Sequence, residues 1–190
     1  MNRFYAMISR MKYIDRWGLM NNTKTENISE HSLEVAILSH ALVTIANTRL
    51  GEDLNADRAA VIGMFHDASE IITGDMPTPI KYYNPEIKNA YKAVEKVAEE
   101  RLISMLPQDL QAVYRPVISN DDAVLEKYVK AADKLSALIK CIEEVRMGNN
   151  EFLKAKESIE KAIEKMELPA LKIFMEECMP SYYLTLDELG

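Results

Sequence analysis

The stretch MFHDASE, residues 64–70, ends an otherwise apolar segment with three titratable side chains within five residues. If the segment is helical, Ile62, His66 and Glu70 share one face, and Asp67 follows His66 directly. Because neighbouring residues on a helix diverge by about 100°, His66 and Asp67 can flank one ion, with Glu70 one turn further on. A lone histidine on an apolar face is also typical of a core imidazole bonded to a carbonyl, so the stretch alone leaves both interpretations open.

The placement of glycine and proline favours an all-α fold. Only 6 glycines and 7 prolines occur, and apart from Gly63 they fall between segments of helical periodicity, while strand-like alternation is scarce. Residues 75–79 and the tail after Pro180 are expected to be irregular. Helices are expected over residues 3–15, over a segment that is capped at Asn27 or Ser29 and carries residues 33–49, from Asn55 or Asp57 to Ile72, and over 85–105, from Pro107 to a point before Pro116, 124–147, 152–166 and 169–178.

The size and composition of the chain fit one globular domain. With 190 residues, 48% hydrophobic and 28% charged, a single domain with one core over residues 1–190 is expected, and two full domains are not. No apolar run approaches the roughly 20 residues that span a bilayer, and the first residues lack the features of a signal peptide. These observations predict a cytoplasmic protein with no membrane partner, in which Cys141 and Cys178 are core thiols.

The charge balance limits the partners. With 23 basic and 30 acidic residues the formal net charge is −7, and the basic residues are scattered along the chain. This pattern argues against long nucleic acid as a partner. A small anion is still compatible, because one or two basic side chains and a metal ion can hold a phosphate within an overall negative field.

Two further helices carry polar residues on apolar faces. His31 lies at the start of a buried line on the second helix, whereas His40, nine residues later, points to the opposite side. On the helix over 124–147, Asp133 lies among aliphatic residues and needs a cation or a buried arginine as a partner. Together with His66 and Asp67 these residues supply two imidazoles and two carboxylates from three helices, a set with which helical bundles build metal sites.

The order of these residues resembles a known signature. His31, then the doublet His66-Asp67, then Asp133 resembles the H…HD…D pattern of the HD-domain metal hydrolases. Along nearly its whole length the chain is similar to the bacterial HD-domain 5′-deoxynucleotidases. The similarity is carried by RW (16–17), TENISEHS (25–32), the doublet with Glu70, TGDMPTP (73–79), GNNEF (148–152) and PS (180–181).

The resemblance implies an all-α, single-domain HD-type helical bundle with His31, His66, Asp67 and Asp133 as metal ligands. Only three histidines occur and His40 is turned away, so one divalent ion is expected rather than two. The mixed nitrogen and oxygen set suits Co, Mn or another transition metal.

The implied reaction is hydrolysis of deoxyribonucleoside 5′-monophosphates to deoxynucleoside and phosphate, by attack of a metal-bound water. The resemblance gives Glu70 the role of orienting or deprotonating that water or of handling the leaving-group proton, and gives Arg16 the role of clamping the phosphate. Trp17 is expected to wall the nucleotide site, although a loop tryptophan is also typical of a core anchor.

The loop that follows the doublet is expected to lie at the mouth of the site. The resemblance implies that Asp75 meets the 3′-hydroxyl and that close packing disfavours a ribose 2′-hydroxyl; a simple interhelical connector is the alternative. The expected substrate-binding residues are Arg16, Trp17, His31, Asp67, Asp75, Met76, Pro77 and Thr78.

The resemblance also implies a homodimer, since members of this family are typically dimeric. Two other functions stay open at this point. One is another HD phosphohydrolase, which acts on a nucleoside triphosphate, a cyclic nucleotide or a different phosphomonoester. The other is a non-catalytic helical module that senses a metal or a nucleotide.

Overall fold

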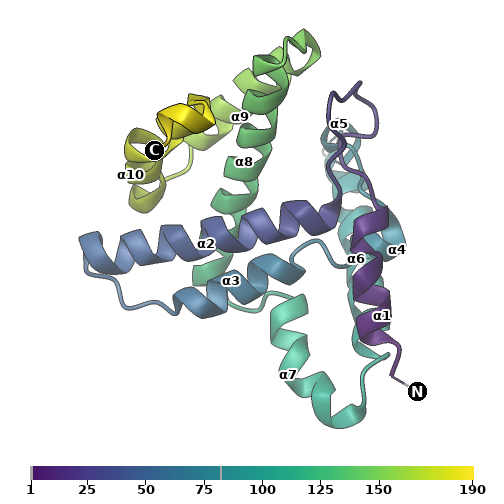
Figure 1. The fold of residues 1–190 in the computed structure, drawn as a ribbon. Helices are drawn as coiled ribbons and strands as arrows, with labels where there is room; N and C mark the ends of the chain where they lie inside the picture. Colours follow the sequence, from purple (N-terminus) through teal and green to yellow (C-terminus); the bar gives the residue numbers. More distant parts are fainter. Residues whose placement is uncertain (1, 82) are drawn as a thin grey trace.

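The computed structural model describes residues 2–81 and 83–190, and over these ranges the chain is helical, as predicted (Figure 1). The extended backbone of the described residues pairs only in one antiparallel bridge, between Asp15 and Asn27. None of the described helices is long and apolar enough to cross a membrane. The α-helices are α1 (Phe4–Ile8), α2 (Ile28–Leu50), α3 (Ala56–Phe65), α4 (Glu70–Thr73), α5 (Thr78–Lys81), α6 (Pro85–Ile103), α7 (Gln108–Ile118), α8 (Ala123–Arg146), α9 (Leu153–Glu164) and α10 (Pro169–Glu177), and the 3₁₀ segments are η1 (Ser9–Tyr13), η2 (Asn150–Phe152), η3 (Met179–Tyr183) and η4 (Leu186–Glu188).

Helix α2 begins and ends at the residues that the sequence indicates. The Asn27 side chain accepts hydrogen bonds from the backbone N–H groups of Ser29 and Glu30, and the Glu30 carboxylate accepts one from the Asn27 N–H. At the other end Gly51 adopts a left-handed conformation with φ 75°, which glycine tolerates at a helix end. The capping box fixes the first turn of α2, which carries His31.

Five helices, α2, α3, α8, α9 and α10, surround a large hydrophobic cluster that we call the main core. Leu42, Ile62 and Leu135 are fully buried in it and come from α2, α3 and α8 respectively. Figure 1 shows α8 crossing α2, with α3 running along α2. The main core therefore fixes the three helices from which the sequence analysis drew its metal ligands.

A second cluster, which we call the small core, joins α1, α6, α7 and the turn after α3. Its buried members include Phe4, Ala68 and Leu102. Phe4 packs edge-on against Tyr114 of α7 at a ring separation of 5.1 Å. Because Ala68 directly follows the His66-Asp67 doublet, the small core holds that turn in place.

The backbones of helices α2 and α3 come close together at Gly63. A Cβ atom at this position would lie 2.9 Å from the Cα atom of Ala36 and 3.0 Å from its backbone nitrogen, both of which are backbone atoms of α2. Only glycine allows this approach. The contact sets the distance between α2, which carries His31, and the end of α3, where His66 lies.

One predicted helix, from Asn55 or Asp57 to Ile72, is wrong as a continuous element. Asn55 caps α3 as expected, but α3 ends at Phe65 and α4 starts only at Glu70. Between these helices the backbone hydrogen bonds span three residues instead of four. The Ala68 N–H donates to the Phe65 carbonyl and the Glu70 N–H donates to the Asp67 carbonyl, both at 3.0 Å. The helix therefore breaks at the doublet itself.

Other boundaries need smaller corrections. Helix α7 continues through Pro116 to Ile118 instead of ending before the proline, because the burial of Val117 and Ile118 favours one more turn. The tail after Pro180 and the segment after Pro77 contain short helical turns where irregular chain was expected. The first segment is only partly α-helical, since residues 9–13 are a 3₁₀ turn.

Candidate metal centre

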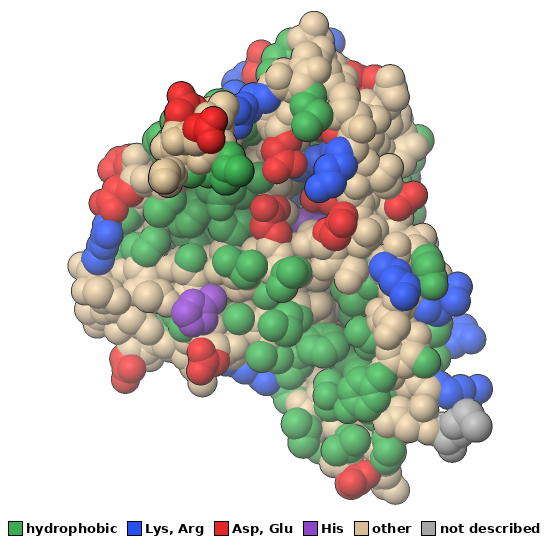
Figure 2. Space-filling model, viewed as in Figure 1, with side chains coloured by type: hydrophobic (Ala, Val, Ile, Leu, Met, Phe, Trp, Pro, Cys, Tyr) green, Lys and Arg blue, Asp and Glu red, His purple; other side chains and the backbone are tan. Residues whose placement is uncertain are grey.

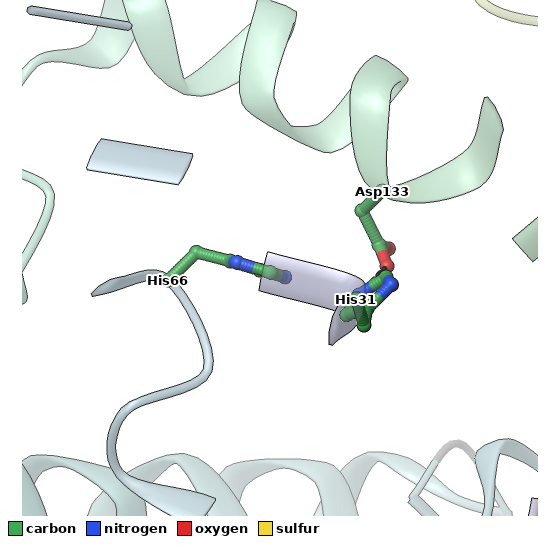
Figure 3. A group of neighbouring side chains, drawn as sticks. All are labelled: His31, His66 and Asp133. Atoms are coloured by element: carbon green, nitrogen blue, oxygen red, sulfur yellow. Dashed lines mark ion pairs between the residues drawn. The ribbon is translucent and has the colours of Figure 1, made fainter. Parts of the chain in front are cut away.

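Three of the four predicted ligands form one group in the structure, and the fourth, Asp67, lies beside both imidazoles. One ligand atom each from His31, His66 and Asp133 lies within 4.8 Å of the others (Figure 3). His31 Nε2 is 3.2 Å from an Asp133 oxygen, and the Asp67 Oδ2 atom is 3.5 Å from His31 Nε2 and 3.1 Å from His66 Nε2. Two imidazole nitrogens and two carboxylates therefore face one small volume.

Three different elements position these side chains. His31 comes from the first turn of α2, Asp133 from the middle of α8, and the doublet from the break after α3. His66 and Asp67 both lie in the break between α3 and α4, and from there both side chains reach the cluster. Figure 2 shows a histidine surface among acidic and basic side chains, in the angle between α2 and α8.

The hydrogen bonds of the two imidazoles favour metal binding. The Nδ1 atom of His66 is 2.8 Å from the Gly63 carbonyl, so it carries the proton, and the Nδ1 atom of His31 is 2.9 Å from the Ser136 hydroxyl. Within the described part of the chain, both Nε2 atoms are buried and have no hydrogen-bond partner. Two orphaned imidazole nitrogens beside two carboxylates are what a divalent cation with N/O ligands requires, so the residues fit the metal that the sequence analysis predicts.

The electrostatics of His31 and of the two carboxylates agree with this fit. Burial and the nearby Arg16 guanidinium lower the pKa of His31, which favours the neutral ring that a metal ligand needs. For Asp67, burial alone would raise the pKa, but the charge of His66 and a hydrogen bond with it outweigh burial and lower the pKa. Burial likewise opposes ionisation of Asp133, yet the polar contact with His31 and the Lys134 ammonium hold its pKa well below the ordinary range.

Glu70 lies at the start of α4 and is only 5% exposed. Among the described atoms its Oε2 has no hydrogen-bond partner. Burial raises the pKa of Glu70 to about 10, and the negative charges of Asp67 and Asp75 add to the rise, while the positive charges of Lys81 and Arg16 oppose it. This carboxyl therefore takes up a proton far more readily than an exposed glutamate does.

Arg16 lies close to the cluster. Its Nη2 atom is 4.0 Å from an Asp133 oxygen, and its Nη1 atom donates to Glu26 at 2.7 Å. The side chain is largely buried, which by itself would lower the pKa of Arg16, but the carboxylates of Glu26 and Asp133 reverse this and raise the pKa. The structure thus places one permanent positive charge at the edge of the predicted metal site.

Trp17 has features of both interpretations that the sequence left open. Its indole N–H donates to the same Glu26 carboxylate at 2.9 Å, and its ring lies 5.3 Å from the ring of Phe152. Its backbone is left-handed, with φ 61°, which is unusual for a bulky residue. Glu26 therefore holds Arg16 and Trp17 together, a role that sequence reasoning missed although Glu26 stands in the stretch 25–32.

A buried polar cluster on α8 anchors the segment that contains Arg16 and Trp17. Glu144, 1% exposed, forms an ion pair with Lys140 and accepts hydrogen bonds from the Thr23 backbone N–H at 2.9 Å and hydroxyl at 2.7 Å. The Lys140 ammonium donates to the Lys24 carbonyl, and Asn149 donates to Glu144 at 2.8 Å. The sequence analysis missed this cluster, which we call the loop anchor. Its signal was the i, i+4 lysine–glutamate spacing inside a mostly apolar helix.

The loop after α4 lies beside the site. Burial raises the pKa of Asp75, while Arg16 and a backbone hydrogen bond from Trp17 act in the opposite direction, so Asp75 is near both. Met76 and Pro77 are half-buried, and the side chain of Thr78 lies outside the described part of the structure. Lys81 follows, pairs with Glu95 at 2.7 Å and was not singled out in the sequence.

The remaining histidine and the cysteines take no part in the cluster. His40 is 48% exposed at its side chain and lies 3.6 Å from Asp57, on the far side of α2 from His31, as predicted. Cys141 is buried and Cys178 half-buried, and both are free thiols. Burial raises the pKa of the Cys141 thiol to about 12, which makes it unreactive.

A helical fold that brings a histidine, an HD doublet and a distant aspartate together defines the class of HD-domain phosphohydrolases. Solved structures have the same fold. An HD-domain phosphohydrolase from Listeria innocua superposes with a TM-score of 0.83 at 24% identity, covering 95% of this chain and 88% of that one. The HD phosphohydrolase DatZ of cyanophage S-2L, solved with dA and one catalytic Zn²⁺ ion, superposes with a TM-score of 0.65 at 19% identity, covering 95% of this chain and 96% of that one.

Sequence comparison gives the family. A model described as 5′-deoxynucleotidase YfbR-like matches residues 3–182. The 5′-deoxynucleotidase YfbR of Escherichia coli is 47% identical over 191 residues, which cover 100% of this chain and 96% of the relative. The chain belongs to the YfbR-like 5′-deoxynucleotidase family.

Proposed function

We propose that this protein is a metal-dependent phosphomonoesterase that hydrolyses deoxyribonucleoside 5′-monophosphates to deoxynucleoside and phosphate. The observation that carries the proposal is the convergence of the two buried, orphaned Nε2 atoms of His31 and His66 with the carboxylates of Asp67 and Asp133. Family membership supplies the substrate class, and the dA bound to DatZ supports it.

The four converging residues would hold one divalent cation. The ligand set suits Co or Mn, and DatZ uses Zn²⁺, so the identity of the metal is a matter for measurement. A cation held here supplies Lewis acidity, both toward water and toward a phosphoryl oxygen. In this proposal His31 and Asp67 also line the bound phosphate.

Glu70 is the residue that we assign to proton transfer. It is buried next to the cluster, and its raised pKa keeps the carboxyl protonated near neutral pH, so that it has a proton to give. The carboxyl gives its proton to the 5′-oxygen of the leaving nucleoside and regains one from the attacking water, so that the side chain ends in the state in which it began.

Arg16 is assigned to the phosphate. Glu26 engages the Nη1 atom, which orients the guanidinium and leaves further N–H groups of its five for phosphate oxygens. A positive charge fixed in this position stabilises the extra negative charge that develops in the transition state. Trp17, held by the same Glu26, would form a wall of the nucleotide site.

The deoxyribose is assigned to the loop after α4. Asp75, near Arg16 and Trp17, would accept a hydrogen bond from the 3′-hydroxyl. Met76, Pro77 and Thr78 would close around the sugar, and proline at 77 makes this loop stiff. A stiff, half-buried wall excludes an added 2′-hydroxyl better than a mobile one.

The test is phosphate release from dAMP and AMP by protein stripped with a chelator and resupplied with Co, Mn, Mg or Zn. Metal-dependent release from dAMP with little from AMP is expected. Equal release from the two would remove the assignment of sugar selectivity to the loop. Release of pyrophosphate or triphosphate from dATP, with none from dAMP, would favour a nucleoside triphosphate hydrolase.

A second experiment separates a hydrolase from a non-catalytic module that senses a metal or a nucleotide. Glu70→Gln is the informative variant, because it removes the proton carrier and keeps the size of the side chain. A hydrolase loses most of its turnover and still binds metal. Nucleotide binding without turnover by the wild-type protein under any metal would establish the sensor instead.

The proposed assembly is a homodimer of single-domain chains that works in the cytoplasm. The C-terminal segment supports an interface, since Tyr183, Leu186 and Leu189 expose 45%, 85% and 58% of their surface. Sedimentation equilibrium of the wild-type protein and of Leu186→Asp checks this. A wild-type monomer would rule out the dimer.

A further inference from the structure

The two histidines of the metal centre are held at Nδ1 by different kinds of partner. His66 faces the Gly63 carbonyl at 2.8 Å, whereas His31 faces the Ser136 hydroxyl at 2.9 Å. A carbonyl only accepts, so it forces the proton of His66 onto Nδ1. A hydroxyl both donates and accepts, so Ser136 alone does not decide which nitrogen of His31 carries the proton.

Two nearby carboxylates favour the His31 tautomer that cannot bind a metal, in which Nε2 carries the proton. His31 Nε2 lies 3.2 Å from an Asp133 oxygen and 3.5 Å from an Asp67 oxygen, and both oxygens are good hydrogen-bond acceptors. A proton on Nε2 would bond to these carboxylates and block the nitrogen that must bind the metal. Something on the Nδ1 side has to outweigh that attraction.

Glu34 is placed to do so. The Ser136 hydroxyl donates to the Glu34 Oε2 atom at 2.5 Å. Once its single proton is committed to this carboxylate, the hydroxyl can only accept from His31, which requires the proton on Nδ1. Ser136 is fully buried, so water does not compete for either bond.

We propose that Glu34, acting through Ser136, is a positioning residue that fixes the tautomer of His31 and so keeps its Nε2 free to bind the metal. The inference rests on the proposed metal site. It adds two residues that the H…HD…D signature does not contain.

The geometry of two helices builds this relay. His31 and Glu34 are three residues apart on α2, and Asp133 and Ser136 are three residues apart on α8, so each pair lies on one face of its helix. Where the helices cross, α8 contacts both nitrogens of the same ring, with Ser136 on Nδ1 and Asp133 on Nε2. The packing of α2 on α8 thus sets both ends of the imidazole at once.

Glu34 differs from the neighbouring carboxylates of Glu30 and Glu143 because it accepts the hydrogen bond from Ser136. It lines a cavity of about 210 Å³ together with other residues that include Glu30 and Glu143. Glu30 is engaged in the cap of α2, and Glu143 is exposed on α8. Glu143→Gln is therefore a matched control, because it makes the same change of charge at the same cavity without touching the relay.

The first measurement reads the tautomer without metal or substrate. ¹⁵N NMR of the imidazoles, in protein stripped of metal at neutral pH, is practical because the chain has only three histidines, and His40→Gln identifies one of them. For wild type and Glu143→Gln, a pyrrole-like shift is expected at His31 Nδ1 and a pyridine-like shift at Nε2. In Glu34→Ala and in Ser136→Ala the two shifts are expected to exchange.

The second measurement is metal affinity, by competition of Co²⁺ or Mn²⁺ with a chromophoric chelator. Changes in residues that orient a metal-bound histidine typically lower affinity about 10–100-fold, and this range is expected for Glu34→Ala. Glu34→Gln keeps an acceptor oxygen and is expected to lose less. Glu143→Gln is expected to bind metal as the wild type does, and circular dichroism with thermal melts confirms that each variant is folded.

An unchanged His31 tautomer in folded Glu34→Ala, or wild-type metal affinity in that variant, would overturn the relay. The proposed function fails differently. If wild type shows the expected tautomer, and Glu34→Ala reverses it, but no metal supports turnover of dAMP, then the relay stands and the deoxynucleotidase assignment does not.

Discussion

The two sides of the proposed site are built by different means. On the metal side His31 and Asp133 stand on α2 and α8, and the apolar packing of the main core fixes their separation. On the substrate side Arg16 and Trp17 stand on an irregular segment that Glu26 and the loop anchor hold through hydrogen bonds and ion pairs. One side depends on shape complementarity, and the other depends on buried charge.

This difference indicates how each side responds to change. Packed helices tolerate changes of pH and salt but not changes of volume. Buried polar contacts are sensitive to the loss of one partner, because the remaining charge stays in a place where water cannot reach it. Substitutions on the two sides are therefore expected to produce distinct signatures, which the following experiments separate.

Removal of a metal ligand is expected to have the largest effect. His66→Ala takes away one imidazole nitrogen and should weaken metal affinity by more than about 100-fold, beyond the range seen for residues that only orient a ligand. Turnover of dAMP should fall with it. Metal competition and phosphate release measure both effects, with His40→Ala as the matched control, since His40 lies outside the cluster. Normal metal binding by His66→Ala would contradict the ligand assignment.

Loss of the proton carrier comes next. Glu70→Gln is expected to lower kcat by about 10²–10⁴-fold, the usual contribution of a positioned acid or base. Metal affinity should stay close to wild type, because Glu70 is not among the ligands. Steady-state kinetics with dAMP and metal titration test this, and Glu52→Gln, an exposed change of the same kind, is the control. A variant with full kcat would remove Glu70 from the mechanism.

Breaking the loop anchor should destabilise the fold. Glu144→Gln leaves the Lys140 ammonium buried without its counter-charge, a situation that costs about 3–5 kcal/mol when a buried pair is broken. Urea denaturation at neutral pH measures the loss. A loss near zero would mean that water reaches the lysine.

The same pair predicts how stability depends on pH. Burial opposes ionisation of Glu144, but the hydrogen bonds from Lys140 and Thr23 dominate and lower its pKa in the folded state. Its contribution is therefore complete above the ordinary glutamate value of about 4.3 and is lost as the pH falls from there toward the folded pKa. The stability difference between wild type and Glu144→Gln should shrink between neutral and strongly acidic pH. An equal difference at both would contradict the assignment.

A change of volume on the metal side should have a moderate effect. Gly63→Ala places a methyl group 2.9 Å from the Ala36 backbone and should force α3 away from α2, at a cost of about 1–3 kcal/mol. Metal affinity should also fall, because His66 moves away from His31. Thermal melts and chelator competition measure this. Gly18→Ala, with nothing within 4 Å of the new methyl, is the control.

The smallest effect is expected for Glu26→Gln. An amide still accepts from Arg16 and Trp17, but the bonds lose their charge assistance, which amounts to about 1 kcal/mol or roughly a 5-fold rise in KM for dAMP. Metal affinity should not change. A fall in metal affinity instead would mean that the two sides of the site are mechanically coupled.

The metal side could be predicted from the sequence, because it depends on helical periodicity. The predictions that His31 lies on a buried face and that His40 points away follow from residue spacing, and the structure confirms both. The caps at Asn27 and Gly51 follow from local preferences in the same way. On this side periodicity failed at the His66-Asp67 doublet, where side-chain and i→i+3 hydrogen bonds replace the regular helix.

The substrate side could not be predicted from spacing. Glu26 meets Arg16 and Trp17 through an irregular turn, and Glu144 meets Thr23 across more than a hundred residues. Contacts of this kind depend on the path of a loop and leave no periodic pattern in the chain. Only the family resemblance pointed to Arg16 and Trp17, and we did not predict from the sequence that Glu26 and the loop anchor hold them.

The left-handed backbone of Trp17 has a consequence for how this segment can change in evolution. A bulky residue at φ 61° is strained by about 1–2 kcal/mol, and a glycine there would relieve that strain. The glycine would also lose the contacts with Glu26 and Phe152. At position 17 the chain accepts a strained backbone, and in return the indole ring is held in a fixed place.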